Sequence, residues 1–374
     1  MAGPIDRLPE GLAARLLALF PGARVIDVVQ IGVDEAQLGK SEPGGETTKG
    51  IGYGQPIRIG LEVSGERHDL VLHTAKPDDF GHDRRSDRVG EMLLAWDTFA
   101  SIPRHVEAID VGLLGPGGEL LSLAGAGEAY LLSRWAEGTP YAVDLRRIAR
   151  SGEVTDEDLR RVDALARLLA EIHAAPGSHA GAYVRAWRDL VGSGEGIAGI
   201  ADGYGGVGMD VVGAPAGRVA AIEARCLEAR HRHRGRVERL RRTHGDFHPF
   251  NILFDGVGAP VLLDASRGAE GDPADDVACL AINFLFFGLE HRDRWVTGLG
   301  RLWHRFFEAY AAQREDAGLF EVIGAFFAWR GLVVTSPAWY PHMTGTDRDR
   351  ILSFVERVLA AERFDPAMGV EAMT

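Results

Sequence analysis

The sequence predicts an α+β protein of two lobes, an N-terminal antiparallel sheet lobe with one main helix and a larger, mostly helical C-terminal lobe. Alternating and β-branched apolar residues dominate about residues 24–76, whereas helical periodicity takes over after about residue 141. A chain of 374 residues is also long enough to bury more than one hydrophobic core. We expect the lobes to span residues 1–135 and 136–374.

The first lobe is expected to contain short strands, bounded by glycine-rich turns, and one helix. The helix is expected at residues 84–102, in the run RRSDRVGEMLLAWDTFASI. Strands are expected at residues 23–31, 55–65, 67–76, 105–114, 118–125 and 128–135. A connector at residues 133–141 follows, because glycine and proline interrupt the pattern there.

The second lobe is expected to be built from amphipathic helices. The glycine-dense stretch at residues 191–217 is the exception, and it predicts a mobile loop or a set of short turns rather than a packed element. The basic run ARHRHRGRVERLRR at residues 229–242 is typical of the solvated face of a helix.

Composition argues against several classes of partner. The formal net charge is -13 and the pI is about 5.5, which disfavours nucleic acid and anionic membranes because both need clustered cations. Cys226 and Cys279 lie too far apart for a disulfide framework or a paired metal knuckle, and they indicate a reducing interior. The longest apolar run, VACLAINFLFFGL, is shorter than the roughly 20 residues of a membrane helix. We therefore expect a cytoplasmic protein.

Acidic and amide residues surround two short apolar runs, NILF and PVLLD. The turn-rich insert DGVGA between the runs predicts a β-hairpin. If Phe254 pairs with Val261, then Asn251 lies directly opposite Asp264, with Cβ atoms about 5 Å apart. Two oxygen donors at that distance suit one hard cation, and Mg²⁺ completes its shell with water and substrate phosphates.

Asp246 precedes the hairpin in HGDFHP, a segment typical of an irregular loop. A carboxylate there can orient an attacking hydroxyl or accept its proton while a metal neutralises phosphate charge. Each of the three polar residues has an ordinary structural role when taken alone, but their combination predicts a site. His244 and His248 are weaker candidates, and His244 is expected to bond to the backbone rather than to a metal.

The order HGD, then Asn251 after four intervening residues, then a hairpin ending in Asp264, resembles the aminoglycoside phosphotransferase and choline kinase-like family. The segments YLLSRWAEG, ALARLLAEIHAAP and GDPADDVACL, the last with Asp276 at a recurrent acidic position, resemble other parts of that family. The resemblance covers most of residues 50–285 and implies a protein-kinase-like fold. It implies transfer of the γ-phosphoryl group of ATP or GTP to a small molecule, with Asp246 as catalytic base and Asn251 and Asp264 as Mg²⁺ ligands.

The resemblance also implies nucleotide-binding residues, mostly in the first lobe. The expected set is Gly50, Gly52, Gly54, His73, Lys76, Glu91, Ser133 and Trp135. The glycines would let backbone amides approach the phosphates. His73 stands where relatives usually have a lysine or arginine, but Lys76 follows three residues later, so both are candidates for the phosphate anchor. Glu91 would pair with that anchor.

The acceptor is expected to be a small hydroxylated molecule, of aminoglycoside, choline or sugar type, whose identity the sequence leaves open. Aromatic and polar residues near the chain end could line its pocket or could equally belong to the core: Trp329, Arg330, Trp339, Tyr340 and His342. A catalytically impaired nucleotide-binding regulator is the alternative, because the phosphate anchor is uncertain and Ala265 and Ser266 depart from the family pattern. A metallohydrolase is disfavoured because its companion motifs are missing.

Overall fold

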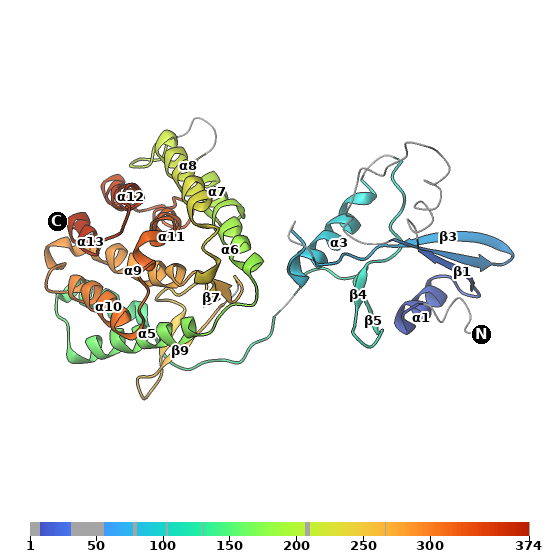
Figure 1. Cartoon of the computed structure of the whole chain (residues 1–374), viewed down its shortest axis with the longest axis horizontal. Coiled ribbons are helices and arrows are strands. Elements are labelled where there is room, and N and C mark those ends of the chain that lie inside the picture. Colours follow the sequence, from blue (N-terminus) through green and yellow to red (C-terminus); the bar gives the residue numbers. More distant parts are fainter. Residues whose placement is uncertain are drawn as a thin grey trace. The chain divides into compact units, whose positions relative to one another are not determined.

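The computed structural model describes residues 8–30, 56–77, 81–101, 104–129, 131–205, 210–265 and 267–373. The chain forms two compact units, Met1–Ser133 and Arg134–Thr374. Small antiparallel sheets and many helices make it an α+β protein, as the sequence predicts (Figure 1). None of the helices among these residues is long and apolar enough to cross a membrane.

The first unit is built on one antiparallel sheet in the order β1 (Arg24–Gln30), β2 (Ile57–Val63) and β3 (Glu66–Leu72). Helix α1 (Glu10–Leu19), which the sequence reading missed, contributes Leu12 and Leu16 to the core beside this sheet. These leucines are four residues apart and so lie on one face of the helix.

The predicted main helix of the first unit is confirmed as α3 (Arg85–Phe99). A short ribbon of β4 (Gly112–Leu114) and β5 (Leu120–Ser122) follows it. The prediction of a strand at residues 128–135 is wrong. The described residues of this segment, 128–129 and 131–135, form no strand. Among the described strands, β4 and β5 pair only with each other, so residues 128–135 have no partner strand in that ribbon.

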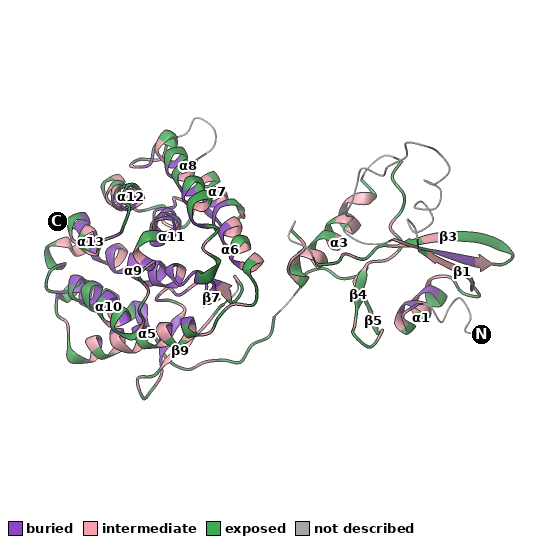
Figure 2. Cartoon of the chain, in the orientation of Figure 1, coloured by how far each residue is buried: buried purple, intermediate pink, exposed green. Residues whose placement is uncertain are grey.

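The second unit is a helical assembly around one large core. Its elements in chain order are β6 (Thr139–Pro140), α4 (Tyr141–Ser151), α5 (Asp156–Ala174), α6 (Ala180–Gly192), α7 (Ile197–Asp202), α8 (Ala216–His233), η2 (Val237–Arg239), β7 (Arg241–Arg242), β8 (Ile252–Phe254), β9 (Pro260–Leu262), β10 (Glu270–Gly271), α9 (Ala274–Gly288), η3 (Leu289–Arg294), α10 (Leu299–Gln313), α11 (Leu319–Val334), α12 (Gly345–Ala360) and α13 (Ala367–Met373). Helix α9 is buried along nearly its whole length and packs against α10 and α11 (Figure 2).

Two small antiparallel sheets frame the polar motif. β7 pairs with β10, and β8 pairs with both β6 and β9. The β7–β8 loop, residues 243–251, is therefore held at both ends, and so is the segment between β9 and β10. Side chains that are distant in sequence meet here on a fixed backbone.

Two expectations for the second unit are corrected by the structure. The glycine-dense stretch contains the packed helix α7, whose Ile197 and Ile200 are buried, because the apolar spacing of three residues places both on one helix face. The basic run is not wholly solvated either. Arg239 is buried because Asp272 and Asp316 bind its guanidinium group with charge-assisted hydrogen bonds.

Candidate active site

The backbone of the β7–β8 loop is anchored by a buried carboxylate at the start of α9. Asp276 is fully buried and accepts hydrogen bonds from the amides of His244 and Gly245, both at 2.8 Å. Its Oδ2 also lies 3.0 Å from Nε2 of His173, whose Nδ1 is 2.7 Å from the hydroxyl of Tyr310. These bonds outweigh the effect of burial and hold the pKa of Asp276 below its usual value, so it stays ionised.

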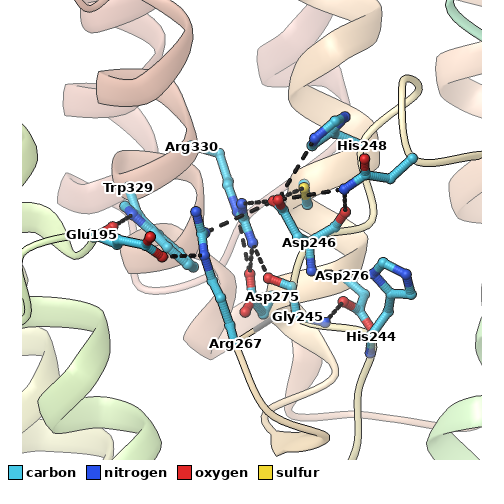
Figure 3. A network of polar contacts seen from close by, with 12 residues as sticks. Glu195, His244, Gly245, Asp246, His248, Arg267, Asp275, Asp276, Trp329 and Arg330 are labelled. Carbon is cyan, nitrogen blue, oxygen red and sulfur yellow. Dashed lines mark hydrogen bonds and ion pairs between the residues drawn. The ribbon is translucent and has the colours of Figure 1, made fainter. Parts of the chain in front are cut away.

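Asp246, the next residue of the loop, carries the carboxylate at the centre of Figure 3. Its side chain is 14% exposed, and its Oδ1 accepts a 2.7 Å hydrogen bond from Nη1 of Arg330. Nη1 of Arg267 lies 3.8 Å from the same oxygen. Burial alone would raise the pKa of Asp246, but these positive charges lower it below the ordinary value, so the carboxylate is ionised near neutral pH.

Arg330 comes from α11 and is itself almost fully buried. Its Nη2 donates to the carbonyl of Gly245 and to Oδ1 of Asp275, both at 2.7 Å. Burial raises the pKa of Asp275, although the charge of Arg330 opposes this. The side chain of Arg330 thus joins α9, α11 and the β7–β8 loop.

The two histidines of the motif serve mainly the loop backbone. Nδ1 of His244 accepts from the amide of Asp246 at 3.3 Å, which confirms the predicted backbone role. Nδ1 of His248 accepts from the amide of Phe250, and its Nε2 lies 3.6 Å from Oδ2 of Asp246. Burial lowers the pKa of His248. It is therefore mostly neutral at physiological pH.

The predicted hairpin is confirmed, but its predicted register is wrong by one residue. Phe254 pairs with Pro260, and so Asn251 faces Leu263, whose amide donates to the Asn251 carbonyl at 2.9 Å. Asp264 lies one residue further on, is exposed, and has a left-handed backbone with φ 50°. Strand alternation therefore does not set the direction of its side chain. An aspartate tolerates this conformation better than most residues, and such outliers concentrate at functional sites.

Asn251 and Asp264, the predicted magnesium ligands, would offer a cation only two oxygen-bearing side chains. The amide nitrogen of Asn251 donates to the Asp246 carbonyl at 3.1 Å, which leaves its amide oxygen as the group available to a cation. In the parts of the chain that the structure describes, no cluster of three or more histidine, cysteine, aspartate or glutamate residues is arranged for a metal. Two oxygen donors fit magnesium, which takes most of its shell from water and phosphates.

Of the predicted nucleotide-binding residues, Gly50, Gly52 and Gly54 lie outside the described residues. His73 and Lys76 are exposed and follow the end of β3, so strand alternation does not choose between them.

Other residues of that set lie on α3 and in the connector. The carboxylate of Glu91 lies 3.1 Å from Nε2 of His82, a partner that the sequence did not suggest. Ser133 and Trp135 are exposed, and the indole of Trp135 donates to Glu137 at 2.8 Å.

Aromatic and charged residues adjoin Asp246 on the side of α11. Nε1 of Trp329 donates to the carbonyl of Glu195 at 2.8 Å, and the Glu195 carboxylate binds Arg267 at 3.1 Å. The guanidinium groups of Arg267 and Arg330 lie 4.6 and 3.9 Å from the Trp329 ring centre. Figure 3 shows this group on one side of Asp246 and His248 on the other.

The other residues suggested for an acceptor pocket lie in the turn after α11. Tyr340 packs against Phe286, with ring centroids 4.8 Å apart, and is partly buried. Trp339 and His342 are exposed.

Sequence reasoning missed Arg267, which lies beside Asp246, and also missed Glu195 and Asp275, which bind Arg267 and Arg330. Arg267 stands only three residues after Asp264, and Asp275 directly precedes Asp276, so both had a positional signal. Glu195 had none, because it lies in the glycine-dense stretch that was expected to be mobile.

Comparison with known proteins gives similar solved structures and a family. Solved structures that resemble the chain include an aminoglycoside phosphotransferase from Alicyclobacillus acidocaldarius, with 14% identity, TM-score 0.34 and coverage of 84% of this chain and 89% of that one. They also include a Plasmodium vivax ethanolamine kinase, with 12% identity, TM-score 0.34 and coverage of 90% of this chain and 84% of that one. A macrolide 2'-phosphotransferase type I has 16% identity, TM-score 0.30 and coverage of 93% of this chain and 96% of that one. No curated protein matches.

The family model described as the phosphotransferase enzyme family matches residues 102–315, which include the β7–β8 loop, the hairpin and Asp276. Because this match spans more than half of the chain, the predicted family resemblance is confirmed: the protein belongs to the phosphotransferase enzyme family and is a small-molecule kinase.

Proposed function

We propose that the protein transfers the γ-phosphoryl group of ATP or GTP to a hydroxyl of a small molecule, with Asp246 as catalytic base. The observation that carries this proposal is the state of Asp246. It is a partly exposed carboxylate, kept ionised by adjacent arginines, on a loop whose amides are tied to Asp276. An ionised carboxylate in a fixed position is what proton acceptance from a hydroxyl requires.

In the proposed reaction the acceptor oxygen bonds to the γ-phosphorus while the bond from that phosphorus to the β–γ bridging oxygen breaks. The acceptor proton passes to the Asp246 carboxylate and then to water, and the nucleoside diphosphate leaves. Mg²⁺ held by Asn251 and Asp264 would neutralise phosphate charge when bound. The protein's own contribution is to fix the base and the acceptor in one geometry.

The residues proposed to bind the nucleotide are those expected from the sequence, in a nucleotide-binding lobe of residues 1–135. The lobe of residues 136–374 would supply the base, the metal ligands and the acceptor site. The aromatic and charged group around Trp329, together with Glu195, is the proposed lining on the acceptor side because it adjoins Asp246. The acceptor is a small hydroxylated molecule.

A screen of metabolite pools for acceptor-dependent consumption of ATP, and in parallel of GTP, tests the proposal. We expect one pool to stimulate nucleoside diphosphate release in the presence of magnesium, and Asp246→Asn to remove this stimulation while nucleotide binding persists. Nucleotide binding without turnover in any pool would instead favour a non-catalytic regulator. Full turnover by Asp246→Asn would show that another group accepts the proton.

A further inference from the structure

Arg330 contacts the proposed catalytic base from outside the segment that the family model matches, which ends at residue 315. It lies on α11, and its side chain is only 5% exposed. The family match therefore assigns it no role. A buried cation in this place needs a physical explanation, because removing a guanidinium group from water costs several kcal/mol.

The two carboxylate oxygens of Asp246 have different surroundings. Oδ1 accepts the 2.7 Å hydrogen bond from Arg330, with Nη1 of Arg267 at 3.8 Å and the thiol of Cys279 at 3.9 Å. Among the residues that the structure describes, Oδ2 has only longer contacts, with Nε2 of His248 at 3.6 Å and Nδ2 of Asn251 at 3.5 Å. Oδ2 is therefore the oxygen with capacity left for a strong hydrogen bond from an acceptor hydroxyl.

Arg330 is held rigidly enough to act as a fixed donor. Its Nη2 donates to the Gly245 carbonyl and to Asp275, its Nε lies 3.3 Å from Asp275, and its plane lies over the ring of Trp329. Only a planar, forked group can bridge two carboxylates and a carbonyl in this way, and the single ammonium of a lysine cannot.

We propose that Arg330 is a positioning residue that holds Oδ1 of Asp246 and thereby presents Oδ2 to the acceptor hydroxyl. The terminal torsion of an aspartate is broad and roughly two-fold, so an unrestrained carboxylate would rotate away from this orientation. The inference rests on the proposed function of Asp246 as base. It assigns to α11 the task of orienting that base.

Two substitutions measure this role. In Arg330→Met the donor is lost, and we expect kcat to fall roughly 100-fold while KM for the nucleotide changes by less than about threefold. Arg330→Lys keeps a single positively charged donor group, the ammonium, and should recover part of the kcat that is lost in Arg330→Met. Circular dichroism gives the folded fraction, to which each kcat is normalised. A normalised kcat of Arg330→Met close to the wild-type value would overturn the inference.

Arg239 offers a matched control in the same unit. It is also buried, at 7% side-chain exposure, and it also bridges two aspartates, Asp272 and Asp316. Its described contacts do not include the β7–β8 loop. Arg239→Met should therefore lower stability but leave kcat per folded molecule near the wild-type value. An equal loss of kcat in the two methionine variants would mean that Arg330 acts only through general stability.

A double-substitution cycle separates the inference from the proposed function. In an Asp246→Asn background, adding Arg330→Met should cause no further loss of the residual kcat measured at high enzyme concentration, because the carboxylate that Arg330 orients is already gone. An additional loss of the same size as in the single variant would refute positioning through Asp246. If Asp246→Asn alone keeps full activity, the proposed function itself fails. If Asp246→Asn is inactive but Arg330→Met is fully active, only the inference about Arg330 fails.

Discussion

Replacing Asp276 with alanine is the sharpest test of how the loop that carries the proposed base is held. The carboxylate is fully buried. It accepts hydrogen bonds from the amides of His244 and Gly245 and from the ring nitrogen of His173. Alanine would leave these donors without partners in a site closed to water. Each unsatisfied buried donor costs about 1–3 kcal/mol.

The expected net loss is smaller than the sum of those costs. Removing Asp276 also removes the cost of keeping its charge out of water, which partly offsets the lost bonds. We therefore expect Asp276→Ala to lower the free energy of unfolding by about 3–5 kcal/mol, as is usual when one partner of a buried pair is removed. Asp276→Asn keeps one acceptor oxygen and should lose about half as much.

Urea unfolding followed by far-ultraviolet circular dichroism measures these losses, because most helices belong to the second unit. Asp293→Ala is the matched surface control: its carboxylate is 78% exposed, and its ion pair with Arg294 should contribute less than about 1 kcal/mol. If Asp276→Ala unfolds within about 1 kcal/mol of the wild type, the buried hydrogen bonds do not anchor the loop as argued.

Two further predictions concern titration and the metal. Burial and the charges of Arg232 and Arg236 lower the pKa of His233 to about 4, below the roughly 6.5 of an unfolded histidine, so the unfolded state binds more protons between these values. Stability should fall by about 1 kcal/mol from pH 7 to pH 5.5, and thermal unfolding of His233→Gln should not show this part of the decrease. Asp264→Ala should weaken binding of the magnesium–nucleotide complex roughly tenfold or more, measured by calorimetry, with little change in unfolding because the side chain is exposed. An unchanged affinity would contradict its assignment as a ligand.

The hairpin could be predicted from sequence, whereas its register could not. The expected pairing of Phe254 with Val261 implies a two-residue loop. In the structure the amide of Asp255 bonds to the Ala259 carbonyl, and a three-residue loop ends with Gly258 in the left-handed conformation, φ 82°. Both loops are common in hairpins, and the sequence GVG suits either. A difference of one loop residue moves every facing pair by one position.

The contact between Arg330 and Asp246 was hidden for a different reason. Arg330 and Asp246 are 84 residues apart, and α11 is apolar on all sides, so no periodicity marks the face that meets the β7–β8 loop. Arg330 could be picked out only as an isolated charge in a hydrophobic helix. A charged residue is rarely fully buried unless it has a partner of opposite charge. An isolated charge in an apolar helix therefore indicates that such a partner lies nearby in the fold.

The first turn of α9 fixes both the backbone and the side chain of the proposed base. Asp276 holds the loop amides, while the adjacent Asp275 holds Arg330, which in turn binds the Asp246 carboxylate and the Gly245 carbonyl. Well-packed apolar residues of similar volume could make this region equally stable or more stable, since buried ion pairs seldom add net stability. Stability therefore does not explain these charges. What they provide is orientation: a helix embedded in the core of the second unit sets where Asp246 lies and which of its oxygens is free.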